Sequence, residues 1–271
     1  VGGIQILNAI SGLGYLFIAQ GWKASIRKKL LLLGYRAILR SKKVWILFQN
    51  PDDQALFTQH KIIFPGHKSI IKGSGVDLQQ FAYSPTPEGK VKIILVARML
   101  WDKGVGEFVE SATRLKQQGL DADFVLVGST DPGNPKSIST KQLEQWNELG
   151  VVKWLGERID IAQLLIESHI AVLPSYREGL PKSLIEAAAI GRAIVATNVP
   201  GCREVVKDGE NGILVSVKNV KELTTAIQKI INNPELLISM GKKSRLIAEQ
   251  EFSIQQVVKQ TLKLYKRLKE L

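Results

Sequence analysis

The chain has 271 residues, of which 45% are apolar and 7% aromatic, and it carries a formal net charge of +12. This length allows one large domain or two small ones with a full hydrophobic core, and the composition excludes disordered, fibrous and disulfide-rich classes. Its single cysteine, Cys202, excludes an internal disulfide framework and fits a reducing cytoplasm. The three histidines are scattered, so Cys and His show no metal-ligand spacing.

Residues 1–22 carry no charged side chain, and their length alone would suit a transmembrane helix. Polar residues and glycines dilute the apolar run, which argues against a membrane span. No basic segment precedes it, which argues against a signal peptide. We interpret this segment as a buried strand followed by a glycine-rich loop.

The segment Lys23–Lys43 contains eight basic residues and no acidic residue, with apolar residues between them. This pattern predicts a basic amphipathic helix suited to the surface of an anionic membrane. A solvated helix with an apolar stripe toward the core would give the same pattern. The residues alone leave these two interpretations open.

The next part of the chain reads as a small α/β unit. The predicted elements are a strand at 43–50, a helix at 51–59, a strand at 60–66 and a strand at 68–81. Gln49 and Asn50 end the first of these strands and are candidates to face a cleft. A boundary near Gly73–Asp77 separates residues 1–75 from residues 76–252. A C-terminal helix is expected at 253–271.

From Val91 onward strands and helices alternate. Strands are predicted at 91–97, 123–128, 151–156, 170–174, 193–197 and 212–216, and helices at 105–118, 140–149 and 159–167, from Pro181, and from near Asn219, Pro234 and Ser253. This order predicts a doubly wound α/β domain with a parallel sheet. Such sheets bind ligands beyond the carboxyl ends of their strands, so chemistry is expected there.

Two cations, Arg98 and Lys103, follow the strand that begins at Val91. An arginine fork and a lysine ammonium next to a helix N-terminus suit a diphosphate. Basic residues are common in loops, so this signal is weak by itself.

The stretch PSYREGLPKSLIEAAAIG places Glu178 in a loop and Glu186 in the first turns of a helix. Carboxylates accept hydrogen bonds from vicinal hydroxyls, as on a ribose or a hexose. The free backbone N–H groups between them can meet phosphate oxygens. By composition alone, a solvated Glu178 and a Glu186 with ordinary i,i+4 helical contacts explain the stretch better than a binding site does.

The sequence from Arg177 to Val215 resembles the retaining glycosyltransferases of family 4, which have the GT-B fold. It shares their Glu-x7-Glu pattern, and the segments ARMLWDKG, LVGS, VVKWLGERID and GSGVDLQQF are similar to other parts of that family. The resemblance implies an α/β protein of GT-B type, with a Rossmann-like donor domain and a partial N-terminal domain.

The resemblance also implies roles for individual residues. Arg98 and Lys103 would hold the donor diphosphate and stabilise the leaving nucleotide. Glu178 would bind the donor sugar, and Glu186 the ribose. Further donor contacts would come from Gly128, Arg158, Asp160, Gly179, Leu180, Pro181, Lys182 and Ser183. Neither a metal nor another cofactor is implied, because cations and a helix N-terminus meet the charge.

Gly179–Leu180–Pro181 stands where the family usually has Gly-Phe-Gly, and this version is similar to a bacterial branch that builds capsule, O-antigen and protein-linked glycans on polyprenyl-diphosphate lipids. The implied reaction transfers a hexose or N-acetylhexosamine from a UDP-sugar to a lipid-linked saccharide. The implied location is peripheral, on the cytoplasmic face of the membrane, with Lys23–Lys43 against anionic lipid.

Three alternatives stay open or are disfavoured. GT-B domains have roughly 150–200 residues each, so the chain would hold only the second part of its N-terminal domain, and a non-catalytic nucleotide-sugar-binding module is the alternative function. A nucleic-acid-binding protein fits the charge, but stacking aromatics and a reader motif are missing. A dinucleotide-dependent oxidoreductase lacks a G-x-G-x-x-G after the strand at Val91.

Overall fold

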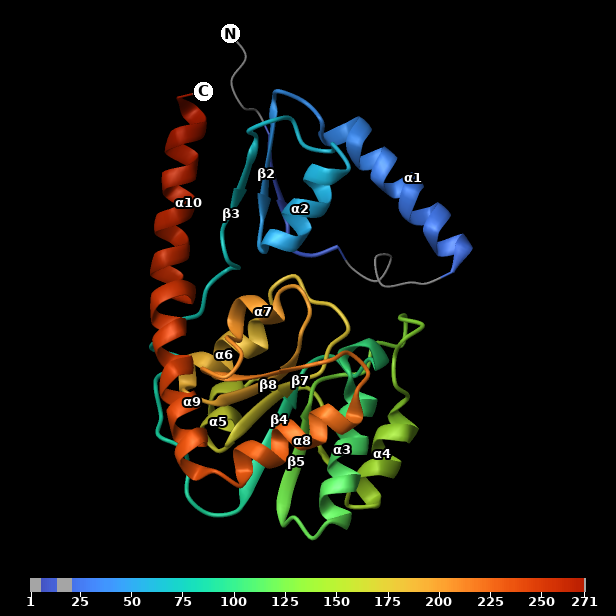
Figure 1. Cartoon of the computed structure of the whole chain (residues 1–271), viewed down its shortest axis with the longest axis vertical. Helices are drawn as coiled ribbons and strands as arrows, with labels where there is room; N and C mark the ends of the chain where they lie inside the picture. The colour runs from blue at the N-terminus through green and yellow to red at the C-terminus, as the bar shows by residue number, and fades with distance from the viewer. Residues whose placement is uncertain (1–5, 14–20, 271) are drawn as a thin grey trace.

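The computed structural model describes residues 6–13 and 21–270, which form two parallel sheets with separate sets of helices (Figure 1). The described strands follow the order β1-β2-β3 in one sheet and β6-β5-β4-β7-β8-β9 in the other. The expected loop at residues 14–20 lies outside the described residues.

The N-terminal part contains the smaller sheet and two helices. Its elements are β1 (Ile6–Ile10), α1 (Trp22–Leu39), β2 (Val44–Phe48), α2 (Pro51–Gln59) and β3 (Lys68–Ile70). The sequence explains where α2 starts, because the Asn50 side chain accepts a hydrogen bond from the Asp53 amide and Pro51 occupies the first turn. Phe48 and Phe57 pack edge to face in the core between β2 and α2.

Three predictions for this part are wrong in detail. Residues 60–66 form a turn rather than a strand, because Lys61 has a φ of 52° and Ile62 packs into the core from the turn. The strand expected at 68–81 ends at Ile70, since glycines with positive φ follow it. The first strand exists, but it is not buried: it lies at the edge of its sheet, and Ile6 is 52% exposed.

The C-terminal part follows the predicted order, with ends that differ by a few residues. Its elements are β4 (Val91–Val96), η2 (Trp101–Lys103), α3 (Val105–Gln117), β5 (Ala122–Val127), α4 (Thr140–Glu148), β6 (Lys153–Trp154), α5 (Ile161–Ile166), β7 (Ile170–Leu173), α6 (Lys182–Ile190), β8 (Ala193–Thr197), α7 (Cys202–Val205), β9 (Gly212–Val215), α8 (Val220–Ile231), α9 (Pro234–Ile247), the π-helical turn η3 (Ala248–Phe252) and α10 (Ile254–Lys269). The predicted six-residue strand at 151–156 is reduced to two residues in β6.

The larger sheet is covered on both faces, as continuous apolar strands require. Alternate β4 side chains point to opposite sides: Ile93 and Leu95 pack with α3, α4 and α8, and Ile94 packs with α5 and α6. The sheet is therefore buried along its length, and its strand ends are the part open to ligands.

The two segments that connect the sheets, one around Val76 and one at residues 252–254, are hydrogen-bonded to each other. This place is called the crossing below. The Val76 amide donates to the Phe252 carbonyl (2.8 Å) and the Ile254 amide to the Val76 carbonyl (3.0 Å). Beyond this crossing α10 runs beside the N-terminal sheet, and its Leu264 packs with Trp45 (Figure 1). The crossing lies near both predicted divisions of the chain, and the division into domains itself stays a prediction.

Candidate functional site

The candidate site lies where the order of strands in the larger sheet reverses. From the central strand β4, the chain adds β5 and β6 on one side and β7, β8 and β9 on the other. Loops that leave neighbouring strands at such a point diverge and open a crevice beyond their carboxyl ends. The loop after β4 carries Arg98 and Lys103, and the loop after β7 carries Glu178.

The structure brings Lys103 and Glu178 together across this crevice. The Lys103 ammonium lies 2.6 Å from a Glu178 carboxylate oxygen, and the side chains are 22% and 11% exposed. The two loops are also joined through Asp102, whose carbonyl accepts from the Tyr176 amide at 2.9 Å. Gly104 permits the approach, because a Cβ there would lie 2.2 Å from the Pro174 carbonyl oxygen.

Arg98 stands on the β5 side of the crevice, where it pairs with Asp131 at 2.7 Å and remains 59% exposed. Gly128 directly follows β5 with a φ of 143°, and a Cβ there would lie 1.9 Å from the Ala97 carbonyl oxygen. A side chain at Gly128 would therefore separate these two strand ends. Arg98 and Lys103 approach the crevice from different sides, and each holds a carboxylate partner.

Helix α6 begins beside the Lys103–Glu178 pair. Pro181 precedes it as N-cap, and the first-turn amides of Lys182 and Ser183 have no acceptor within the helix. Positive partial charge therefore collects at this helix end. This helix end and Lys103 together have the charge and the N–H donors that suit an anion of phosphate type.

Glu186 lies one turn further along α6 and is buried, at 8% exposed. Burial raises the pKa of its carboxyl, and the Lys182 ammonium at 3.5 Å partly opposes this rise. Helical side chains lean toward the N-terminus, so the Glu186 side chain is directed toward the end of α6 at which Pro181 and Lys182 lie. A buried, partly unscreened carboxylate is a strong acceptor for hydroxyl groups.

The remaining predicted residues lie in the loops that follow β6 and β7. Arg158 and Asp160 form a two-bond pair at 2.8 and 2.6 Å in the exposed loop before α5, and this pair lowers the pKa of Asp160. Leu180 packs at the crossing between the sheets, where a Cβ on Gly73 would lie 2.6 Å from its methyl group. Gly179 sits against the N-terminal part, within reach of Ser11.

The N-terminal part supplies contacts that sequence reasoning missed. The Asn50 amide donates to the Gly179 carbonyl at 2.8 Å, and the buried Asp53 carboxylate pairs with Arg177. Asn50 was a candidate to face the cleft, and its contact with the loop after β7 agrees with that interpretation. Asp53 was not a candidate, because an acidic residue in a first helical turn has an ordinary explanation in the helix dipole.

Three residues with reactive side chains lie outside the crevice chemistry. His169 is buried, its Nδ1 accepts from the Lys92 amide at 3.1 Å, and burial lowers its pKa, so it is a neutral structural residue. Burial raises the pKa of the Cys202 thiol, which makes it inert. His67 is half-buried and stacked on Trp45.

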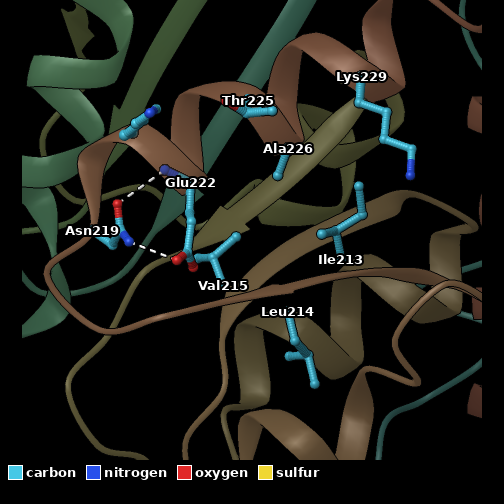
Figure 2. A pocket seen from close by; sticks show the side chains of 9 residues that line it. Ile213, Leu214, Val215, Asn219, Glu222, Thr225, Ala226 and Lys229 are labelled. Atoms are coloured by element: carbon cyan, nitrogen blue, oxygen red, sulfur yellow. Dashed lines mark hydrogen bonds between the residues drawn. The ribbon is translucent and has the colours of Figure 1, made fainter.

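A separate groove of about 530 Å³ runs between β9 and α8, along the outer edge of the larger sheet (Figure 2). The acidic residue that lines this groove, Glu222, already has hydrogen-bond donors: its carboxylate accepts from the Asn219 side chain at 2.6 Å and from the Ser216 amide at 2.7 Å. The groove lies along the sheet edge and does not hold the predicted site residues.

Comparison with known proteins agrees with this geometry. The family model for "Glycosyl transferases group 1" matches residues 77–247. The N,N'-diacetylbacillosaminyl-diphospho-undecaprenol alpha-1,3-N-acetylgalactosaminyltransferase of Campylobacter jejuni is 34% identical over 96% of this chain and 69% of its own length. An uncharacterized glycosyltransferase of Haemophilus influenzae is 38% identical over 62% of this chain and 47% of its own length.

Solved structures show the same fold. Sucrose-phosphate synthase of Thermosynechococcus elongatus superposes with a TM-score of 0.81 at 23% identity, over 97% of this chain and 67% of its own. HepE of Anabaena, solved in complex with UDP and glucose, superposes with a TM-score of 0.79 at 19% identity, over 96% of this chain and 71% of its own. These likenesses confirm the predicted GT-B-type α/β fold.

Proposed function

Since the chain belongs to the group 1 glycosyl transferases, we propose that it transfers a hexose or N-acetylhexosamine from a UDP-sugar to a lipid-linked saccharide. The observation that carries this proposal is the Lys103–Glu178 pair beside the N-terminus of α6. The name of the Campylobacter relative supports a lipid-linked acceptor, and the UDP in the HepE structure supports the nucleotide. Capsule or O-antigen synthesis is the proposed context.

In the proposed reaction the bond between the sugar C1 and the donor phosphate breaks through an oxocarbenium-like transition state. Negative charge then grows on the departing diphosphate, where Lys103, Arg98 and the first amides of α6 stabilise it. An acceptor hydroxyl bonds to C1 on the side the phosphate leaves, and its proton passes to the departing phosphate oxygen. Glu178 would hold the sugar hydroxyls during this exchange, with retention at C1.

The same groups explain why the proposal includes no metal. Two cations and a helix N-terminus meet a diphosphate at the strand ends, and a preorganised set of donors does the work that a metal does elsewhere. Transfer is therefore expected to continue in excess EDTA. A loss of activity that Mg²⁺ restores would contradict this part of the proposal.

The direct test is calorimetric titration of the chain with UDP, GDP and ADP, on the wild type and on Glu186→Gln. We expect saturable UDP binding that this substitution weakens about tenfold, because a neutral amide accepts hydrogen bonds from ribose hydroxyls less well than a carboxylate. Glu235→Gln, an exposed glutamate in the first turn of α9, is the matched control and should leave UDP affinity unchanged.

Tighter binding of GDP or ADP would replace UDP in the proposal. Binding of no nucleotide would overturn it. If a UDP-sugar binds but no transfer follows, the non-catalytic binding module is the better description of this chain.

Glu186→Gln also predicts a change in the pH dependence of stability. Burial raises the pKa of Glu186 above its ordinary value of 4.5, so the protonated form is favoured in the folded protein. Protonation of Glu186 therefore stabilises the folded state. This stabilisation is fully present below pH 4.5 and is lost as the pH rises through the pKa that Glu186 has in the folded protein. The variant should therefore melt at a higher temperature than the wild type at pH 7.5, and the gap should close toward pH 4.5. An equal gap at both pH values would contradict this assignment.

We also propose that α1 rests on an anionic membrane. Five large apolar side chains of α1 are exposed, and four of them are spaced by four, four and three residues, which places these four on one helical face while Ile38 (74%) lies off it: Trp22 (71%), Ile26 (49%), Leu30 (63%) and Leu33 (60%). Leu32 and Leu39 are buried on another face against the core. A solvated helix with one apolar stripe toward the core explains the buried leucines, but it does not explain the exposed apolar face.

The distribution of charge supports the same proposal. Residues 1–75 contain eleven basic and two acidic side chains, and so carry +9 of the net +12. Both acidic residues, Asp52 and Asp53, face the C-terminal part through Arg203 and Arg177, which leaves the α1 side of the molecule basic. In the described residues, no helix has both the length and the apolarity to cross a bilayer.

The paired substitution Leu30→Ser and Leu33→Ser is expected to weaken binding to phosphatidylglycerol vesicles at least tenfold, because each buried leucine contributes about 1.5–3 kcal/mol. Sedimentation with vesicles at low and high salt measures this, and wild-type binding should fall with salt. Val258→Ser with Leu262→Ser, an exposed apolar pair on α10, is the matched control. Equal losses in both pairs would contradict a role specific to α1.

A further inference from the structure

The loop Ser175–Gly179, here called the donor loop, is held from both parts of the molecule. On the C-terminal side the Ser175 hydroxyl donates to the Asp102 carbonyl at 3.2 Å, close to the Tyr176 contact with the same oxygen. On the N-terminal side Asn50 and Asp53 contact Gly179 and Arg177. The two N-terminal contacts therefore fall on the residues immediately before and after Glu178.

Asn50 uses its whole side chain at this junction. Its oxygen accepts from the Asp53 amide at 2.8 Å and caps α2, while its nitrogen donates to the Asp53 carboxylate at 3.0 Å and to the Gly179 carbonyl at 2.8 Å. The side chain is completely buried. An amide satisfied in this way has one orientation, so it fixes the Gly179 carbonyl relative to α2.

Asp53 is a fully buried carboxylate, and a buried charge is costly unless it is paired. One of its oxygens accepts from Arg177 and the other from Asn50. The neighbouring Asp52 also reaches across, to Arg203 at 2.8 Å, but it is 41% exposed and does not contact the donor loop in that pair. The buried contact is therefore the one that can transmit position to the loop.

The backbone at Gly179 has no room to move toward Ser11 and Gly12 or toward Gly201. A Cβ on Gly179 would lie 1.7 Å from the Ser11 carbonyl oxygen and 2.9 Å from the Gly12 Cα. A Cβ on Gly201, on the C-terminal side, would lie 2.5 Å from the Gly179 carbonyl oxygen. The chain at Gly179 is thus enclosed by both parts of the molecule.

We propose that Asn50 and Asp53 are positioning residues that fix the Glu178 carboxylate, so that binding of the donor sugar depends on the N-terminal part. The inference rests on the proposed role of Glu178 in holding that sugar. The nucleotide half of the donor would contact Arg98, Glu186 and the start of α6, all in the C-terminal part. Loss of the N-terminal contacts should therefore affect the sugar half and spare the nucleotide half.

The test compares Asp53→Asn with Asp52→Asn in the full chain. For each variant, calorimetry gives the dissociation constants of UDP and UDP-N-acetylgalactosamine. We expect Asp53→Asn to leave UDP affinity within about twofold and to raise the ratio of the UDP-sugar constant to the UDP constant about tenfold. Asp52→Asn should change neither value. An unchanged ratio in Asp53→Asn, or the same rise in Asp52→Asn, would overturn the inference.

Arg177→Met provides a second variant that does not alter the cap of α2. It should reproduce the effect of Asp53→Asn, and the double variant should add little to either, because both substitutions remove the same contact. Fully additive effects on the ratio would overturn the inference. Thermal melting of each variant separates a change in the ratio from a loss of folding.

Hydrogen exchange separates this inference from the proposed function. The amides of residues 176–180 should exchange faster in Asp53→Asn and Arg177→Met than in the wild type or Asp52→Asn. A wild-type chain that binds neither ligand would overturn the proposed function, and exchange then decides the positioning role alone. Protection that is equal in Asp53→Asn and Asp52→Asn would overturn that role.

Discussion

Replacement of Lys103 by alanine is expected to lower kcat for sugar transfer by about 10²–10³-fold, the usual loss when one preorganised donor is removed from a site of developing charge. The ammonium lies in a partly buried crevice beside the α6 N-terminus, where charge is screened less than at the surface. Its effect should fall mainly on kcat, because it is needed most when the diphosphate leaves. Steady-state transfer from a UDP-sugar to a polyprenyl-diphosphate-linked saccharide measures it.

Lys103 pairs with Glu178, so Lys103→Ala also changes the surroundings of the Glu178 carboxylate. Its removal leaves the Glu178 carboxylate, at 11% exposure, without this cation, so part of any loss in activity would reflect a disturbed loop. A thermal melt reports that disturbance. The double variant Lys103→Ala with Glu178→Gln removes the unpaired charge and should recover stability without recovering activity.

Lys116→Ala is the control, since this lysine lies at the far end of α3 and donates to the Gly150 carbonyl. It should retain activity within about twofold, as expected for an exposed contact. If Lys103→Ala kept kcat within threefold of the wild type, the lysine would not be the group that stabilises the leaving diphosphate.

The larger sheet was predictable because its signals are local. Each of its longer strands is a short apolar run bounded by turns, and most of its longer helices have a capping side chain or a stopping glycine. The topological rule for parallel sheets then predicts that the loops carrying Lys103 and Glu178, 75 residues apart, both lie at the carboxyl ends of the strands. The details of that meeting, such as the direct ion pair, depend on side-chain packing and were not predictable.

The N-terminal part was harder to predict for a physical reason. A run such as Lys61–Phe64 is apolar enough for a strand, yet its isoleucines are buried equally well from a turn. Short apolar runs do not distinguish these cases. The contact of Asp53 with Arg177 spans 124 residues and both sheets, and neither residue has a local signal for it. Such pairs are visible only once the two parts are placed together.

Arg192 gives the largest expected effect on stability. It is 1% exposed at the start of β8 and donates to main-chain carbonyls of Ser168 (2.8 Å), Pro85 (3.0 Å), Ile190 (3.3 Å), Ile166 (3.5 Å) and Ser84. These acceptors come from the Pro-rich segment before β4, the end of α5 and the end of α6. One side chain thus ties three segments to the buried sheet.

Burial lowers the pKa of Arg192 to about 10, so the guanidinium still carries its charge at neutral pH. Replacement by methionine keeps much of the volume but leaves several buried carbonyls without a donor, and each unsatisfied group costs about 1–3 kcal/mol. We expect Arg192→Met to lower the free energy of unfolding by at least about 3 kcal/mol. Urea unfolding followed by circular dichroism measures this change.

Two further substitutions show whether the carbonyl contacts cause the loss. Arg192→Lys keeps a charge but offers one ammonium in place of a planar fork, so it should recover less than half of the stability. Arg114→Met removes an exposed arginine that pairs with Glu110 within α3, and it should cost less than about 0.5 kcal/mol. If Arg192→Met cost no more than Arg114→Met, the buried carbonyls would be satisfied by water, and Arg192 would not be the group that holds the three segments together.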